Sequence, residues 1–121
     1  MKVVRKENSP RYERDGITSY LLVAESTTGA KEITTTLVEM KPGGRQRVHS
    51  HENEQCYMIL EGAGKMTVAG ETRTLRAGET VFIPSNAPHG LVNTGKGPLI
   101  YISAASPPFG APKEKEYWPM K

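Results

Sequence analysis

The stretch GGRQRVHSHENEQCYMILEG, residues 43–62, decides the fold. Glycines mark its two ends, and the polar segment Arg45 to His51 is followed by a short apolar run from Gln55 to Leu60, a pattern typical of two strands joined by a turn. His49 and His51 lie two residues apart, and side chains at that spacing point to the same face of a strand. Both imidazoles would then project from one side, at a separation that suits a shared metal ion.

A second stretch, GETVFIPSNAPHGLVN at residues 78–93, contains the remaining histidine of the chain. Pro84 ends one strand, and His89 begins another directly after the turn at residues 86–88. Gln55 opens the strand that follows the histidine pair. Four side chains from three strands could therefore close around one ion: His49, His51, Gln55 and His89.

Short runs rich in Val, Ile, Thr and Tyr lie on both sides of these stretches, with Gly or Pro between them. No run has sustained helical periodicity, so we expect an all-β protein of eight or nine strands, a sandwich or a closed barrel. The expected strands cover residues 17–25, 33–41, 45–51, 55–60, 65–69, 71–76, 79–83, 89–93 and 99–104. The first two should form a hairpin around a turn at residues 26–29.

Composition narrows the functional class. The 121 residues make one domain, with 16 Lys and Arg against 13 Asp and Glu. The basic residues are dispersed, which argues against nucleic-acid binding. Cys56 has no second cysteine to pair with, so a reducing cytoplasm is the expected location. Neither a signal peptide nor a membrane-spanning run is expected, and we predict no membrane partner.

The spacing of the site residues resembles the two motifs of the cupin family. The first motif matches Gly43, His49, His51, Gln55 and Gly62, separated by five, one, three and six residues. The second matches Gly78, Pro84, His89 and Asn93. Gln55 stands where Glu is usual, and Asn86 stands where Gly is usual, a position where Asn tolerates a left-handed backbone. Fifteen residues separate Gly62 from Gly78, which is similar to small single-barrel cupins.

This resemblance implies a double-stranded β-helix, the jelly-roll β-barrel. One domain would cover residues 1–121, with a barrel core over about 17–105 and an extended carboxy-terminal arm over 106–121. It also implies one divalent transition metal, which the donor types allow to be zinc, iron, nickel, cobalt, manganese or copper.

The glutamine changes the chemistry that such a metal would support. Three imidazoles and an amide oxygen are neutral, so the charge of the ion stays uncompensated and an anionic ligand should be favoured. Gln55 also cannot accept a proton as a general base. An octahedral ion would keep two positions for a ligand.

The alternation of side chains along a strand indicates two further candidate site residues, Arg47 and Tyr57. Arg47 shares parity with His49, and Tyr57 shares parity with Gln55, so both are candidates to face the interior as catalytic residues. Arg47 would anchor a carboxylate or phosphate; the alternative is that it reaches solvent or Glu52. Tyr57 has core packing as its alternative, and Cys56 should point away from the metal as a small core residue.

These features predict a metal-dependent enzyme acting on a small anionic or sugar-derived molecule, as a Lewis-acid isomerase or lyase. A dioxygenase and a non-catalytic small-molecule sensor remain alternatives. The ligand set is similar to that of cupins that open unsaturated uronate rings, although Ser103 stands where that subgroup has an acidic residue. The resemblance also implies a homodimer, to which the Val3–Val4 segment and the Tyr117–Trp118 arm could contribute.

Overall fold

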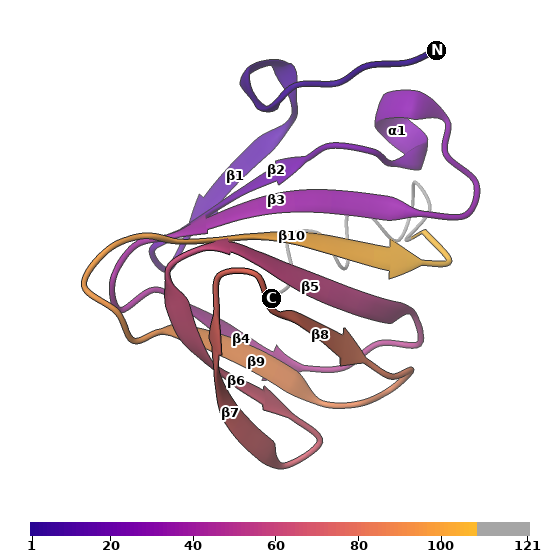
Figure 1. Cartoon of the computed structure of the whole chain (residues 1–121). Coiled ribbons are helices and arrows are strands. Elements are labelled where there is room, and N and C mark those ends of the chain that lie inside the picture. The colour runs from indigo at the N-terminus through magenta and orange to yellow at the C-terminus, as the bar shows by residue number, and fades with distance from the viewer. Residues whose placement is uncertain (109–121) are drawn as a thin grey trace.

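Two antiparallel sheets make up the part of the chain that the computed structural model describes, residues 1–108 (Figure 1). The larger sheet has the order β1-β2-β3-β10-β5-β8, and the smaller has the order β4-β9-β6-β7. The larger sheet comprises β1 (Arg11–Arg14), β2 (Ile17–Leu21), β3 (Thr34–Met40), β10 (Leu99–Ser106), β5 (Glu54–Glu61) and β8 (Thr80–Ile83). The smaller comprises β4 (Arg45–His49), β9 (His89–Asn93), β6 (Ala63–Val68) and β7 (Glu71–Arg76).

Strict alternation of side chains determines which face of each strand is buried. Along β3 every second residue from Thr34 to Met40 is buried, and the residues between them are half-buried. The neighbouring β10 has the same pattern from Leu99 to Ala105. Because side chains alternate between faces with a period of two, both strands place one set of residues between the sheets.

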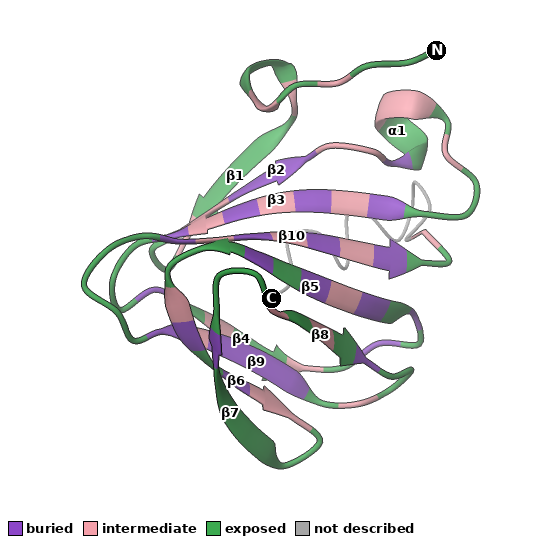
Figure 2. Ribbon diagram, in the orientation of Figure 1, coloured by how far each residue is buried: buried purple, intermediate pink, exposed green. Residues whose placement is uncertain are grey.

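The hydrophobic core lies between the two sheets, and Figure 2 shows buried residues on strands of both sheets. Tyr57 and Tyr101 are among the largest fully buried side chains, and their ring centroids lie 4.6 Å apart. The remaining members come from both sheets: Val38, Met40, Ile59, Met66, Leu75, Ile83, Leu91 and Leu99. Burial of these side chains is the main force holding the sheets together.

The all-β prediction is confirmed, with differences at the amino terminus. Each of the nine expected strands corresponds to one of β2 to β10, and β2 pairs with β3 as the expected hairpin. The connection is not a simple turn, because it contains the one-turn helix α1 (Glu25–Thr28). Strand β1 and the short 3-10 helix η1 (Lys6–Asn8) were not predicted.

The expectation of a closed barrel is wrong. Backbone pairing within the described residues runs inside each sheet, and no strand pair joins the two sheets. A barrel needs continuous pairing around its circumference, but edge strand β8 has only four residues and is followed by Pro84, which has no backbone N–H to donate. The jelly roll is therefore a sandwich that stays open.

Two expectations concerned the ends of the chain, namely the Val3–Val4 segment and the carboxy-terminal arm that was predicted to begin at residue 106. The Val3–Val4 segment forms no strand, and next to it the Lys2 Nζ donates a hydrogen bond to the Thr28 carbonyl of the same chain at 2.7 Å. Ser106, the first residue of the predicted arm, ends β10 instead. Residues 109–121, with Tyr117 and Trp118, lie outside the described part. Neither helix in the described range has the length and apolarity that a membrane crossing requires.

A candidate metal centre

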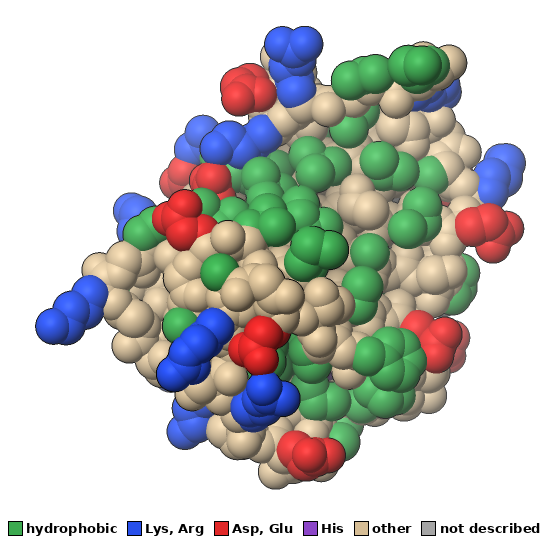
Figure 3. Space-filling model, in the orientation of Figure 1, with side chains coloured by type: hydrophobic (Ala, Val, Ile, Leu, Met, Phe, Trp, Pro, Cys, Tyr) green, Lys and Arg blue, Asp and Glu red, His purple; other side chains and the backbone are tan. Residues whose placement is uncertain are grey.

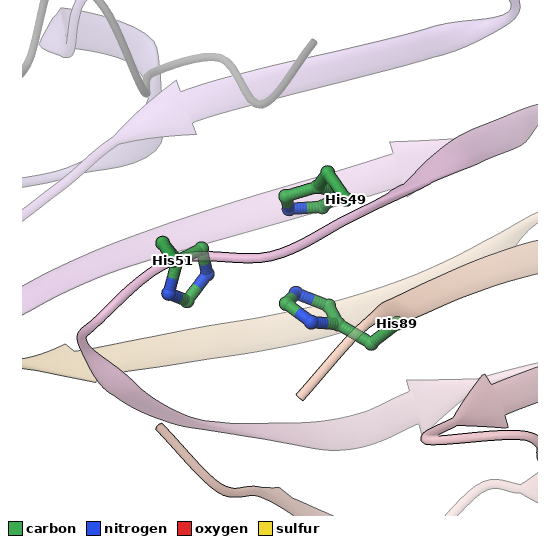
Figure 4. A group of neighbouring side chains, drawn as sticks. All are labelled: His49, His51 and His89. Atoms are coloured by element: carbon green, nitrogen blue, oxygen red, sulfur yellow. The ribbon is translucent and has the colours of Figure 1, made fainter. Parts of the chain in front are cut away.

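Three histidines meet between the sheets at one end of the sandwich. His49 ends β4 and His89 begins β9, and these two residues are directly paired across the strands. His51 lies in the loop that leads into β5. Their ring centroids are 4.3 Å apart for His49 and His89, 5.0 Å for His51 and His89, and 5.6 Å for His49 and His51. One ring nitrogen from each lies within 4.8 Å of the others, and Figure 4 shows the three rings facing one another.

Backbone carbonyls determine which nitrogen each imidazole turns toward the centre. The Nδ1 atoms of His49, His51 and His89 lie 2.9, 3.0 and 2.9 Å from the carbonyl oxygens of Arg47, Asn53 and Ala87, respectively. A carbonyl can only accept, so each neutral ring carries its proton on Nδ1 and presents the Nε2 lone pair. This is the arrangement that orients histidine ligands in metal sites.

Two of the three Nε2 atoms lack a hydrogen-bond partner among the described residues. These buried atoms belong to His49 and His89. A buried polar atom without a partner destabilises the fold by about 1–3 kcal/mol, so such atoms are rare and point to a missing ligand. A metal ion at the point where the lone pairs converge would satisfy both nitrogens, and the residues present therefore fit one.

Burial also keeps the rings of His49 and His89 in the neutral form that a metal requires. Desolvation lowers the pKa of His49 below its usual value of 6.5. The same cause lowers the pKa of His89 to about 4; the hydrogen bond to Ala87 opposes this shift, and the neighbouring histidines add to it. Both rings are therefore unprotonated at neutral pH, which removes competition between protons and metal.

Gln55 joins this cluster from β5, where its side chain is buried. Its Oε1 lies 2.9 Å from His51 Nε2, and its amide nitrogen donates to Ser103 Oγ on β10 at 2.6 Å. Because His51 Nδ1 faces the carbonyl of Asn53, Oε1 and Nε2 both present lone pairs to each other. Two such acceptors repel unless a proton or a cation lies beside them. The fourth candidate ligand thus stands with its oxygen toward the same centre.

Arg47 does not face the interior, so the parity argument for it is wrong. Its side chain is 64% exposed, and its guanidinium lies 3.7 Å from the carboxylate of Asp15. The register between β4 and β9 shifts between Gln46 and His49, as in a β-bulge, and an extra residue reverses the alternation. Gln46 faces the interior in place of Arg47 and accepts a hydrogen bond from the Tyr57 hydroxyl at 2.8 Å.

Tyr57 faces the interior, as its parity predicted. It is fully buried beside Tyr101, and its ring centroid lies 6.2 Å from that of His89. Desolvation raises the pKa of the phenol far above 10, so its hydroxyl stays protonated and its bond to Gln46 persists. These contacts describe a core residue beneath the cluster; a catalytic role for Tyr57 stays a prediction.

Two further residues support the cluster: Asn53, which was not predicted, and Asn86, which was singled out only for its backbone conformation. The side-chain amide of Asn53 donates to the Pro107 carbonyl, which ties the loop of His51 to the end of β10. The backbone N–H of Asn86 donates to the His51 carbonyl at 2.8 Å. Asn86 has a φ of 65°, the left-handed conformation expected where Gly is usual. The loops that carry His51 and precede His89 are thereby fixed to each other.

Comparison with known proteins finds one matching family model and several similar chains. The family model described as Cupin domain matches residues 36–105. An uncharacterized protein of Methanocaldococcus jannaschii is 32% identical over 114 residues, covering 90% of each chain. A dimethylsulfoniopropionate lyase of Ruegeria pomeroyi is 31% identical over 90 residues; the match covers 74% of this chain but only 59% of the lyase. The solved structure of a polyketide cyclase from Streptomyces resistomycificus aligns with a TM-score of 0.74 at 28% identity, covering 99% of this chain and 94% of the cyclase.

Proposed function

The chain belongs to the cupin family, and from that premise we propose that it is a metal-dependent enzyme acting on a small anionic molecule. The observation that carries the proposal is the pair of buried, unpartnered Nε2 atoms on His49 and His89. His51 and Gln55 would complete a site for one divalent transition metal. Bound there, the metal would supply Lewis-acid activation of an oxygen-containing ligand.

The ligands themselves argue for an anionic substrate. All four are neutral, and no Asp or Glu belongs to the cluster among the described residues. A divalent ion held by neutral donors keeps its charge, and that charge is favourable for a carboxylate in a poorly solvated site. Arg47 is exposed and paired with Asp15, so it does not compete for this role at the cluster.

The type of reaction that we propose rests on a similar protein rather than on geometry. The lyase of Ruegeria pomeroyi acts on dimethylsulfoniopropionate, a small carboxylate, and favours a lyase over the dioxygenase and sensor alternatives. Gln55 cannot take up a proton, and Tyr57 is a buried phenol held protonated, so neither supplies the base for an elimination. The two residues instead orient: Gln55 toward the centre, and Tyr57 by packing beneath it.

The test is metal stoichiometry followed by anion binding. Inductively coupled plasma mass spectrometry of untagged protein, reconstituted with Zn²⁺ or Co²⁺, should give about one equivalent for wild type and for Arg47→Ala, a control on the same strand as His49. His89→Ala should bind none. Oxalate should then shift the visible absorption of the Co²⁺ protein, and ethylene glycol at equal concentration should not.

Failure at each stage has a separate meaning. Wild-type protein that retains no metal after reconstitution would exclude the metal site. Metal binding without any response to oxalate would leave the site and remove the anionic substrate.

A further inference from the structure

Gln46 on β4 points into the space between the sheets, and the candidate metal centre leaves its amide nitrogen unused. Its Oε1 accepts a hydrogen bond from the Tyr57 hydroxyl at 2.8 Å. The nitrogen donates to no group within residues 1–108, yet it is not one of the buried atoms without a partner there. The residue is half-buried, on an edge strand of the smaller sheet. The nitrogen therefore borders space that a small molecule can reach.

Tyr57 determines which end of that amide is free. An amide oxygen can only accept a hydrogen bond, so the phenol donates and holds Oε1, and Gln46 is left with two N–H donors. The ring of Tyr57 is itself held, because it is fully buried against the ring of Tyr101. Gln55 is anchored in the opposite sense, with its nitrogen on Ser103 and its oxygen toward the histidines. One glutamine thus presents an acceptor and the other presents a donor.

Strand pairing places Gln46 next to the histidine cluster. It pairs with Leu91 on β9, and His89 lies on the same strand, pointing to the same face. The backbone oxygen of Gln46 would lie 3.0 Å from a Cβ on Gly90, the residue directly after His89. The Tyr57 ring, whose hydroxyl contacts the Gln46 side chain, has its centroid 6.2 Å from that of His89. A short ligand held at the cluster would therefore reach the Gln46 amide.

The groups around Gln46 are polar but uncharged. The buried polar side chains of the described residues are Ser, Thr, Asn, Gln and His, with no Asp, Glu, Lys or Arg among them. Thr36 pairs with Ser103, and Ser103 pairs with Tyr57, so two hydroxyls lie on the sheet opposite Gln46. Charged side chains instead project from the surface on the face that Figure 3 shows. A second carboxylate on a substrate would find no counter-charge here, whereas a neutral oxygen would find a donor.

We propose that Gln46 selects the substrate, by donating a hydrogen bond to a neutral oxygen of a small monocarboxylate whose carboxylate binds at the metal centre. The inference rests on the proposed function, since the metal ion is what holds the carboxylate. Gln46 thereby takes the interior place that alternation predicted for Arg47, but with another preference: a guanidinium favours a second anion, whereas an amide suits a hydroxyl or a carbonyl. Tyr57 is a positioning residue that acts through Gln46.

Two acids that differ by one hydroxyl test this role. Propionate and 3-hydroxypropionate are titrated separately into the Co²⁺-loaded protein, and the visible absorption gives a dissociation constant for each. Wild type should bind 3-hydroxypropionate about fivefold more tightly, the ratio that one hydrogen bond supplies. Gln46→Leu should bring the ratio close to one and leave the affinity for propionate unchanged. A preference caused by the hydroxyl binding the metal directly would survive in this variant.

Further variants separate hydrogen-bond donation from packing. Gln46→Met has the length of glutamine but no N–H, so it should lose the preference as Gln46→Leu does. Tyr57→Phe releases the amide and should retain only part of the preference. Arg47→Ala is the matched control, because Arg47 lies on the same strand with its side chain 64% exposed, and it should keep the wild-type ratio. A merely structural role for Gln46 would change both affinities alike, and circular dichroism checks the fold of each variant.

The same titrations distinguish failure of this inference from failure of the proposed function. If wild type responded to neither acid, the anionic substrate would be excluded, and the role of Gln46 with it. If propionate bound but the hydroxy acid bound no more tightly, the anionic substrate would stand and the role of Gln46 would be overturned. A preference that survives in Gln46→Leu or in Gln46→Met would overturn that role as well.

Discussion

The amide nitrogen of Gln55 donates a hydrogen bond to the hydroxyl oxygen of Ser103 at 2.6 Å, and both side chains are buried. The bond joins two neighbouring strands, β5 and β10, at the point where the histidines meet. An amide has a donor end and an acceptor end, so holding the nitrogen on Ser103 directs the oxygen toward His51. Ser103 thereby acts on the candidate ligand set without belonging to it.

Replacing Ser103 should weaken metal binding. In Ser103→Ala the amide of Gln55 loses its anchor and can turn its nitrogen toward His51 Nε2, which removes an oxygen donor. We expect the Zn²⁺ dissociation constant, measured by competition with a chromophoric chelator, to rise about 10-fold, within the 10–100-fold range for residues that orient ligands. Ser103→Thr retains the hydroxyl and should bind nearly as wild type. Equal affinities for the alanine and threonine variants would contradict this role.

Changing the ligand charge should move metal and anion affinity in opposite directions. Gln55→Glu places a carboxylate beside the ion and cancels one unit of its charge, so Zn²⁺ should bind at least 10-fold more tightly. The same charge should weaken oxalate binding to the metal-loaded protein by a similar factor, measured by isothermal titration calorimetry. A variant that binds both more tightly would show that charge does not select the anion.

Removing a histidine whose Nε2 has no hydrogen-bond partner should separate the effect on metal binding from the effect on stability. His89→Leu abolishes metal binding, but it also removes a buried Nε2 that has no partner among the described residues. That gain of about 1–3 kcal/mol offsets the lost hydrogen bond to Ala87, worth about 1 kcal/mol. The metal-free variant should thus melt at or above the temperature of metal-free wild type in differential scanning calorimetry, and Zn²⁺ should not raise its Tm.

A cavity-forming variant provides the comparison for that experiment. His89→Ala lacks the same nitrogen but leaves space in a fully buried site, so it should be less stable than His89→Leu by about 2 kcal/mol. If both variants were destabilised equally against metal-free wild type, the orphaned nitrogen would not be a source of instability.

The sequence predicted the histidine cluster because its signals are local. A spacing of two places His49 and His51 on one face, and the turn at residues 86–88 delivers His89 at the start of a strand. The prediction that Arg47 faces the interior was wrong for a reason that is not local. The bulge between Gln46 and His49 depends on how β4 pairs with β9, and the alternation of side chains within one strand cannot reveal it.

The missed elements have similar causes. Strand β1 reads Arg-Tyr-Glu-Arg, a charged segment that forms a strand only because β2 offers it an edge. Whether the two sheets close into a barrel depends on strands far apart in sequence. The sequence singled out Ser103 only as a departure from a subgroup that has an acidic residue there; its contact with Gln55 depends on β10 pairing with β5, which the sequence does not reveal.

Two glycines in the same backbone conformation provide a test of how the fold is held near its hairpin ends. Gly62 and Gly70 have φ values of 84° and 85°, so an alanine at either position is strained alike, by about 1–2 kcal/mol. Their surroundings differ: a Cβ at Gly62 would lie 2.3 Å from the carbonyl oxygen of Pro98, and a Cβ at Gly70 would meet nothing within 4 Å. The difference between the two variants therefore isolates the close approach of residues 62 and 98.

We expect Gly70→Ala to lower the free energy of unfolding by about 1 kcal/mol and Gly62→Ala to lower it by about 3 kcal/mol or more, since the carbonyl is backbone and must shift with its strand. Urea denaturation followed by circular dichroism measures both. Gly62 lies at the end of β5 away from Gln55, so the folded variant should still bind one Zn²⁺. Equal losses for the two glycines would mean that β5 and the chain before β10 do not approach as closely as described.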